Sequence, residues 1–104
     1  MFMISKEAMN SLISLRDKMA DSRKKSECVV ALENMIRAKE SHLARAEWSS
    51  CCGNICNLVP QLDTELRMLQ NILEVLRKGD SNKAAFLLDD YIAFLQKSYS
   101  LEPD

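Results

Sequence analysis

The chain contains very few residues that end a helix. Among its 104 residues, Gly occurs only at Gly53 and Gly79, and Pro only at Pro60 and Pro103. The segments between them are rich in Leu, Ala, Met, Glu, Lys and Arg, which have the highest helix propensities. No segment alternates between apolar and polar residues, as a half-buried strand does. The sequence therefore predicts an all-α fold, an antiparallel bundle of three or four helices joined by short turns.

Apolar residues recur at spacings of three and four along the chain, which predicts a single domain with helices at about 5–20, 27–50, 55–78 and 82–99. The polar run 21–27 predicts a turn, although no Gly or Pro there forbids one continuous helix. Lys39 interrupts the apolar stripe of the second segment. The third segment has the most regular pattern, a heptad seam formed by Ile55, Val59, Leu62, Leu66, Leu69, Leu73 and Leu76.

Two short motifs mark the ends of the last helices. Arg77 and Lys78 precede Gly79, and this order predicts a helix C-terminus, because cations favour the negative end of the helix dipole and Gly adopts the left-handed conformation. Asp80, Ser81 and Asn82 form a capping cluster that predicts the start of the next helix. Oppositely charged residues four apart predict ion pairs along the helices: Glu33–Arg37, Asp63–Arg67 and Glu74–Lys78.

Composition and charge argue against several classes of partner. The formal net charge is −1, so the chain as a whole has no electrostatic attraction for nucleic acid or anionic lipid. No apolar run approaches the roughly 20 residues of a membrane span. The first residues lack a basic leader followed by a long apolar stretch, so we expect a cytoplasmic protein with reduced thiols.

The sequence offers little catalytic equipment. It has one histidine, no Gly-x-Ser-x-Gly elbow and no phosphate-binding Gly loop. His42, with Arg45 and Ala46, partly resembles the motif of histidine phosphotransfer domains, which are also four-helix bundles and carry Lys and Gly at the last two positions. Ala in place of that Gly favours the interpretation of His42 as a surface residue. We therefore expect neither an enzyme nor a bound cofactor.

Four cysteines define an alternative, a metal or redox module. Cys52 and Cys56 have the spacing of one half of a zinc site, and Cys51 and Cys28 could add thiolates. No second pair of ligands is present, which favours cysteines that pack as small apolar residues.

The leading functional hypothesis is a small non-enzymatic protein-binding module. The fourth segment is apolar over most of its circumference, so it should either lie at the centre of the bundle or bury a face against something outside this chain. The predicted partner-binding residues are Phe2, Leu87, Tyr91, Phe94 and Tyr99. Such a module would act as an adaptor, chaperone or inhibitor, and its size also fits a regulator encoded by a phage or mobile element. Surplus apolar surface also predicts a homodimer.

A second alternative is a nucleic-acid-binding regulator. Arg23, Lys24 and Lys25 form a basic run between the first two predicted helices, where they could contact phosphates. Asp21 and Glu27 dilute this charge, which favours the interpretation of the run as a solvated turn.

Overall fold

The computed structural model describes residues 2–50 and 58–101. It shows an all-α arrangement of four helices, as predicted, with a 3-10 turn and two short strands added. In chain order the elements are β1 (Phe2–Ile4), α1 (Lys6–Met19), η1 (Ser22–Lys24), α2 (Lys25–Ser50), α3 (Leu58–Arg77), α4 (Ser81–Ser98) and β2 (Tyr99–Leu101).

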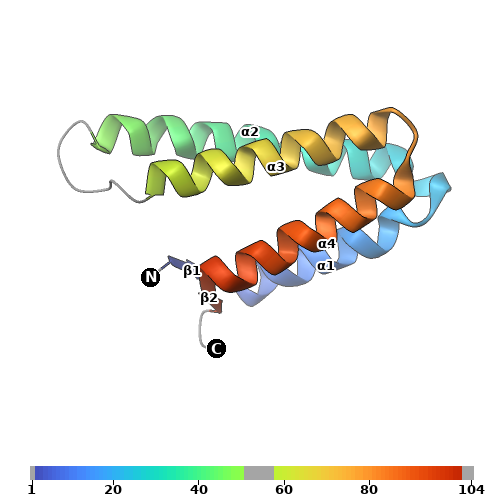
Figure 1. Ribbon diagram of the computed structural model, residues 1–104, viewed down its shortest axis with the longest axis horizontal. Coiled ribbons are helices and arrows are strands. Elements are labelled where there is room, and N and C mark those ends of the chain that lie inside the picture. Colours follow the sequence, from blue (N-terminus) through green and yellow to red (C-terminus); the bar gives the residue numbers. More distant parts are fainter. Residues whose placement is uncertain (1, 51–57, 102–104) are drawn as a thin grey trace.

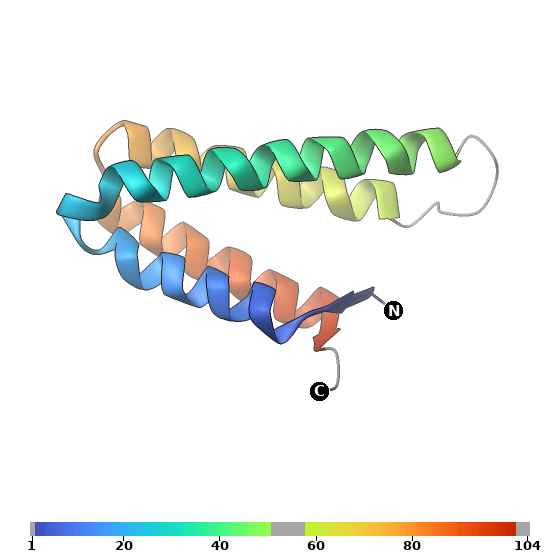
Figure 2. The ribbon, with the colours of Figure 1, turned by 180° about the vertical axis from the view of Figure 1, so that it is seen from behind.

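The helices are arranged as two side-by-side pairs (Figure 1). One pair is α2 with α3, and the other is α1 with α4. The pairs meet at the end where η1 joins α1 to α2 and where α3 turns into α4, and they diverge toward the chain termini. α3 also packs against α4 and connects the pairs, whereas α1 and α2 pack less extensively than the other neighbouring helices (Figure 2).

The predicted break between the first two helices is present. Ser5 caps the N-terminus of α1 and accepts a hydrogen bond from the Ala8 amide at 3.1 Å. The helix ends at Met19, and the Asp21 carboxylate accepts the Arg23 amide at 3.0 Å. This local bond satisfies an amide at the start of η1, so the polar run favours a turn over a continuous helix.

The turn between α3 and α4 also follows the sequence prediction. Gly79 has a φ of +94°, in the left-handed region that favours glycine. Its amide donates to the Leu76 carbonyl at 3.0 Å, and the Asp80 amide donates to the Val75 carbonyl at 3.3 Å. Asp80 then caps α4 by accepting the Lys83 amide at 3.0 Å. The turn therefore satisfies polar groups at the ends of both helices.

One apolar core runs through the bundle. The heptad seam of α3 is buried from Leu62 to Leu76, and Ile72 widens it. Predicted seam member Ile55 lies outside the described residues. The buried cluster contains Met9, Leu12, Leu15, Met19, Cys28, Leu32, Ile36, Leu66, Leu69, Ile72, Leu73, Leu76, Ala84, Leu88, Tyr91, Ile92 and Leu95.

The absence of strands in the sequence prediction was wrong. β1 and β2 pair in parallel, with Phe2 opposite Tyr99 and Ile4 opposite Leu101. The last helix consequently ends at Ser98, and Tyr99 has extended backbone angles. Each strand has three residues, too few for an alternating pattern to stand out, and the pairing depends on the bundle bringing the chain ends together.

The ion pairs follow the prediction in part. Arg67 pairs with Asp63 at 3.1 Å and Lys78 with Glu74 at 3.0 Å. The predicted pair within α2 was wrong, because Glu33 contacts Arg77 of α3 at 3.5 Å instead. Within residues 2–50 and 58–101, none of the helices is long and apolar enough to cross a membrane.

Candidate binding groove

A groove of about 880 Å³ lies between α1 and α2, where the two helix pairs diverge. Helices α1 and α2 form its walls, and α3 and α4 contribute its floor. Its volume is in the range of pockets that bind ligands. This volume makes the groove a candidate functional site.

Each wall of the groove is one face of a helix. Ala8, Ser11, Leu12 and Leu15 line it from α1 at the spacings that keep residues on one side of a helix. Ala31, Met35, Ala38 and His42 line it from α2 in the same way. The small side chains Ala8, Ser11, Ala31 and Ala38 leave room between the walls. Both walls thus have the pattern by which helices pack against one another.

The floor of the groove is apolar along most of its length. Leu69 of α3 and Leu95 of α4 lie there together with the ring of Tyr91. These side chains are 0%, 2% and 2% exposed, so the floor is the surface of the core itself. The floor therefore has little apolar surface left to remove from water, and an apolar occupant would bury mainly the exposed wall residues such as Ala8 and Ala38.

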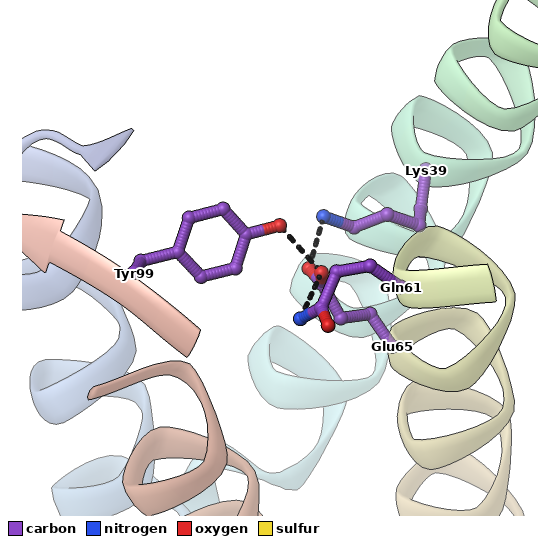
Figure 3. A network of polar contacts seen from close by, with 4 residues as sticks. All are labelled: Lys39, Gln61, Glu65 and Tyr99. Atoms are coloured by element: carbon purple, nitrogen blue, oxygen red, sulfur yellow. Dashed lines mark hydrogen bonds and ion pairs between the residues drawn. The ribbon is translucent and has the colours of Figure 1, made fainter. Parts of the chain in front are cut away.

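A polar network closes the floor at its wide end (Figure 3). Its centre is Glu65 of α3, which is 1% exposed. Oxygen Oε1 of Glu65 accepts a hydrogen bond from Nζ of Lys39 at 2.8 Å. Oxygen Oε2 accepts from the Tyr99 hydroxyl at 2.5 Å and from Nε2 of Gln61 at 3.0 Å. Lys39 belongs to α2 and Tyr99 to β2, so the network joins both helix pairs.

This arrangement compensates the burial of a charged group. A carboxylate without partners in a protein interior is strongly destabilising. The Lys39 ammonium balances its charge, and three donors occupy its oxygens. Among the described residues, no buried side-chain oxygen or nitrogen is left without a hydrogen-bond partner. Every buried polar side-chain atom of this network thus has a hydrogen-bond partner, and the rest of the interface is apolar.

The two tyrosines of this region hold their protons strongly. Burial is the largest cause of the raised pKa of Tyr91, followed by the negative charge of Glu65. Burial also raises the pKa of Tyr99, and its hydrogen bond to Glu65 adds to the effect. Both phenols therefore remain neutral over the ordinary working range of pH, and the Tyr99 hydroxyl stays a hydrogen-bond donor to Glu65.

Sequence reasoning missed Glu65 and Gln61. The available signal was Lys39, which interrupts the apolar stripe of α2, together with an acidic residue beside the heptad position Leu66. A charge that interrupts one apolar stripe, together with an opposite charge beside the stripe of a facing helix, indicates a buried ion pair. The match could not be made before the register between α2 and α3 was known.

The predicted partner-binding residues do not form one exposed face. Tyr91 is 2% exposed within the chain and forms part of the groove floor, so it would contact a partner only through the groove. Leu87 and Phe94 of α4 are half-buried and pack against the core. Tyr99 belongs to the polar network, and the side chain of Phe2 lies outside the described residues.

The basic run lies at the opposite end from the network. Arg23 and Lys24 are exposed in η1, and Lys25 begins α2. The Arg23 guanidinium contacts the Asp21 carboxylate at 3.3 Å, which offsets part of the positive charge.

Of the four cysteines, Cys28 lies within the described residues. Cys28 is 0% exposed in the core, where burial is the main cause of its raised pKa. Cys51, Cys52 and Cys56 lie outside the described residues. Within residues 2–50 and 58–101, no three His, Cys, Asp or Glu side chains are grouped as metal ligands would be.

Comparison with protein-family models, with curated proteins and with solved structures found no match to this chain. The groove and its polar network are therefore the features from which a function is inferred.

Proposed function

We propose that this chain is a non-enzymatic binding protein whose groove accepts an amphipathic helix of another protein. The observation that carries the proposal is the helical stripe of apolar and small residues on both walls of the groove. Residues 8–18 of α1 and 27–42 of α2 line it, which corresponds to about 15 Å and about 22 Å at the rise of an α-helix. This length suits an occupant of roughly three to four helical turns.

The packing of the bundle supports a helix as the occupant. Three of the four interfaces between neighbouring helices are closely packed: α2 with α3, α3 with α4, and α1 with α4. Among the described helices, the interface between α1 and α2 is the open one. A helix seated there would contact Leu12 and Leu15 on one side and Met35 on the other. It would complete the bundle by the same side-chain packing that joins the other helices.

The charges of the groove favour an uncharged helix face. Lys18 and Lys39 line it together with Glu27 and Glu65, so its lysines and carboxylates balance. A nucleic-acid groove requires an excess of positive charge to neutralise phosphates. The balance complements an apolar helix and argues against a strand of nucleic acid as the occupant of this groove.

A helix-binding protein of this size would act as an adaptor, a chaperone or an inhibitor of its target. In each case the chain covers an apolar helix face that would otherwise contact water or a third protein. No chemical step is required of the groove, because Glu65 is already bound by Lys39, Gln61 and Tyr99.

The proposal can be tested with a phage-displayed library of 15-residue amphipathic helices selected against the full chain. We expect binders with apolar residues three and four apart, and we expect amide NMR shifts at Ser11, Ala31 and Ala38. The substitution Ala38→Phe fills the groove and should abolish binding. The matched variant Ala93→Phe changes an exposed alanine that does not line the groove and should bind normally.

Three results would contradict the proposal. One is the absence of any binder that is sensitive to Ala38→Phe. A second is salt-sensitive binding of a 20-base-pair DNA duplex that is lost in Lys24→Ala, which would favour the nucleic-acid alternative. The third is a dimer in sedimentation that becomes monomeric in Ala38→Phe, because the groove would then be filled by a second copy of this chain.

A further inference from the structure

We infer that the hydrogen bond between Tyr99 and Glu65 ties the wide ends of the two helix pairs together and sets the width of the groove. Tyr99 is thus a positioning residue that acts through Glu65. The inference deepens the proposed function and rests on it for its biological meaning, because the width of the groove determines which helices fit.

The connectivity of the chain supports this role. Tyr99 directly follows α4, and its strand β2 pairs with β1, which leads into α1. Its backbone is therefore attached to both members of the α1 and α4 pair. Glu65 belongs to α3 and is held by Lys39 of α2, so it is attached to both members of the other pair. The 2.5 Å bond joins the two units (Figure 3).

The position of the Tyr99–Glu65 hydrogen bond gives it a large effect on the angle between the two helix pairs. The pairs are joined at the narrow end by η1 and by the turn at Gly79, α3 packs against α4 between them, and they diverge toward the chain termini (Figure 1). A contact at the wide end therefore has the greatest leverage over the angle between them. Both tyrosines line the groove, but Tyr91 lies near Glu65 from within the core, whereas Tyr99 reaches Glu65 from the strands at the end of the groove.

Loss of the Tyr99 hydroxyl should let the two helix pairs move apart at the wide end of the groove and leave the contacts within each pair in place. In Tyr99→Phe, Glu65 keeps its bonds to Lys39 and Gln61, so the α2 and α3 pair retains its polar contacts. The ring of residue 99 also remains to cover the core. We therefore expect the variant to fold with the same helix content and with a wider, more variable groove.

Distances between spin labels test the inference directly. Labels are placed at Glu7 of α1 and Ser41 of α2, which are exposed and lie on opposite sides of the groove, in a chain with Cys51, Cys52 and Cys56 changed to Ser. Tyr99→Phe should shift this distance distribution to longer values and broaden it. A second label pair at Ser41 and Thr64, within the α2 and α3 pair, should keep its distance.

Two further variants complete the experiment. Asp89→Asn removes a 2.6 Å ion pair with Arg16 inside the α1 and α4 pair and should leave the groove distance unchanged. Glu65→Gln keeps an acceptor for Tyr99 but loses the charge, so it should give a smaller shift in the same direction as Tyr99→Phe. This variant provides an independent test if Tyr99→Phe does not fold.

An unchanged groove distance in folded Tyr99→Phe, or an equal change within the α2 and α3 pair, would overturn the inference. The same holds for an unchanged distance in folded Glu65→Gln when Tyr99→Phe is unfolded. Because no partner is present in these measurements, their failure is distinguishable from failure of the helix-binding proposal.

Discussion

The ammonium of Lys39 lies 2.8 Å from the carboxylate of Glu65, at an interface whose neighbouring positions are apolar. Both residues line the groove, but the two side chains are 22% and 1% exposed, so the lysine is partly open to water while the carboxylate is almost completely buried. Removing two charges from water is costly, and their attraction only partly offsets that cost. Such a pair is better explained by its position in a groove than by a gain in stability.

We predict that removing one partner of this ion pair lowers the free energy of unfolding more than replacing both partners by apolar residues does. Lys39→Met leaves the Glu65 charge uncompensated and should lower the free energy of unfolding by about 3–5 kcal/mol. The double variant Lys39→Met with Glu65→Leu should recover part of that loss, because no uncompensated charge remains, although Gln61 and Tyr99 lose their acceptor. Urea denaturation measures both changes.

The ion pair between Arg77 and Glu33 is the matched control. It also joins α2 to α3, but its separation is 3.5 Å and its side chains are 57% and 33% exposed. Arg77→Met should therefore cost no more than about 1 kcal/mol. A loss in Lys39→Met as small as the loss in Arg77→Met would show that the buried pair has no special energetic role.

We also predict that stability falls in alkaline solution because of Tyr99. The pKa of this residue is raised in the folded state, so above pH 10, the ordinary pKa of tyrosine, the unfolded chain releases the proton more readily. The associated stability is fully present below that pH and is lost as the pH rises toward the folded-state pKa. Each such tyrosine contributes a slope of at most about 1.4 kcal/mol per pH unit.

Urea denaturation of the wild type and of Tyr99→Phe at pH 8, 10 and 11 measures this contribution. The wild type should lose stability more steeply above pH 10 than the variant, because the variant lacks one titrating phenol. Groups that do not interact with Tyr99 cancel in the difference, which therefore reports Tyr99 together with Tyr91, whose pKa is also raised by the charge of Tyr99. Parallel pH profiles would contradict the assigned role of the Tyr99 hydroxyl.

Cys28 should be protected from thiol reagents. Its side chain is fully buried, and its pKa is raised chiefly by burial and also by the charge of Glu27. In a chain with Cys51, Cys52 and Cys56 changed to Ser, we expect 5,5′-dithiobis(2-nitrobenzoate) to react at least about 100-fold more slowly than in urea. That factor corresponds to an opening reaction of several kcal/mol. Rapid reaction in native buffer would show that this part of α2 opens readily.

The sequence allowed the helices and turns to be predicted because their signals are local. The stripe ending at Leu76, the left-handed Gly79 and the cap at Asp80 are each specified by residues within a few positions. The Lys39–Glu65 pair and the contact of Tyr99 with Glu65 link residues 26 and 34 positions apart. Such contacts depend on the angle between helix pairs, which apolar periodicity leaves open. The groove follows from the same angle and could not be predicted either.

Gly79 offers a test of the turn that joins the two helix pairs. A β-carbon at this position would meet no atom within 4 Å, so the cost of Gly79→Ala comes only from its φ of +94°. We expect a loss of about 1–2 kcal/mol in the free energy of unfolding. Gly79→Asn should lose less, since Asn tolerates left-handed backbone angles better than Ala does. Equal losses in the two variants would indicate that the turn relaxes to another conformation, and an NMR structure of Gly79→Ala would then show an altered junction between α3 and α4.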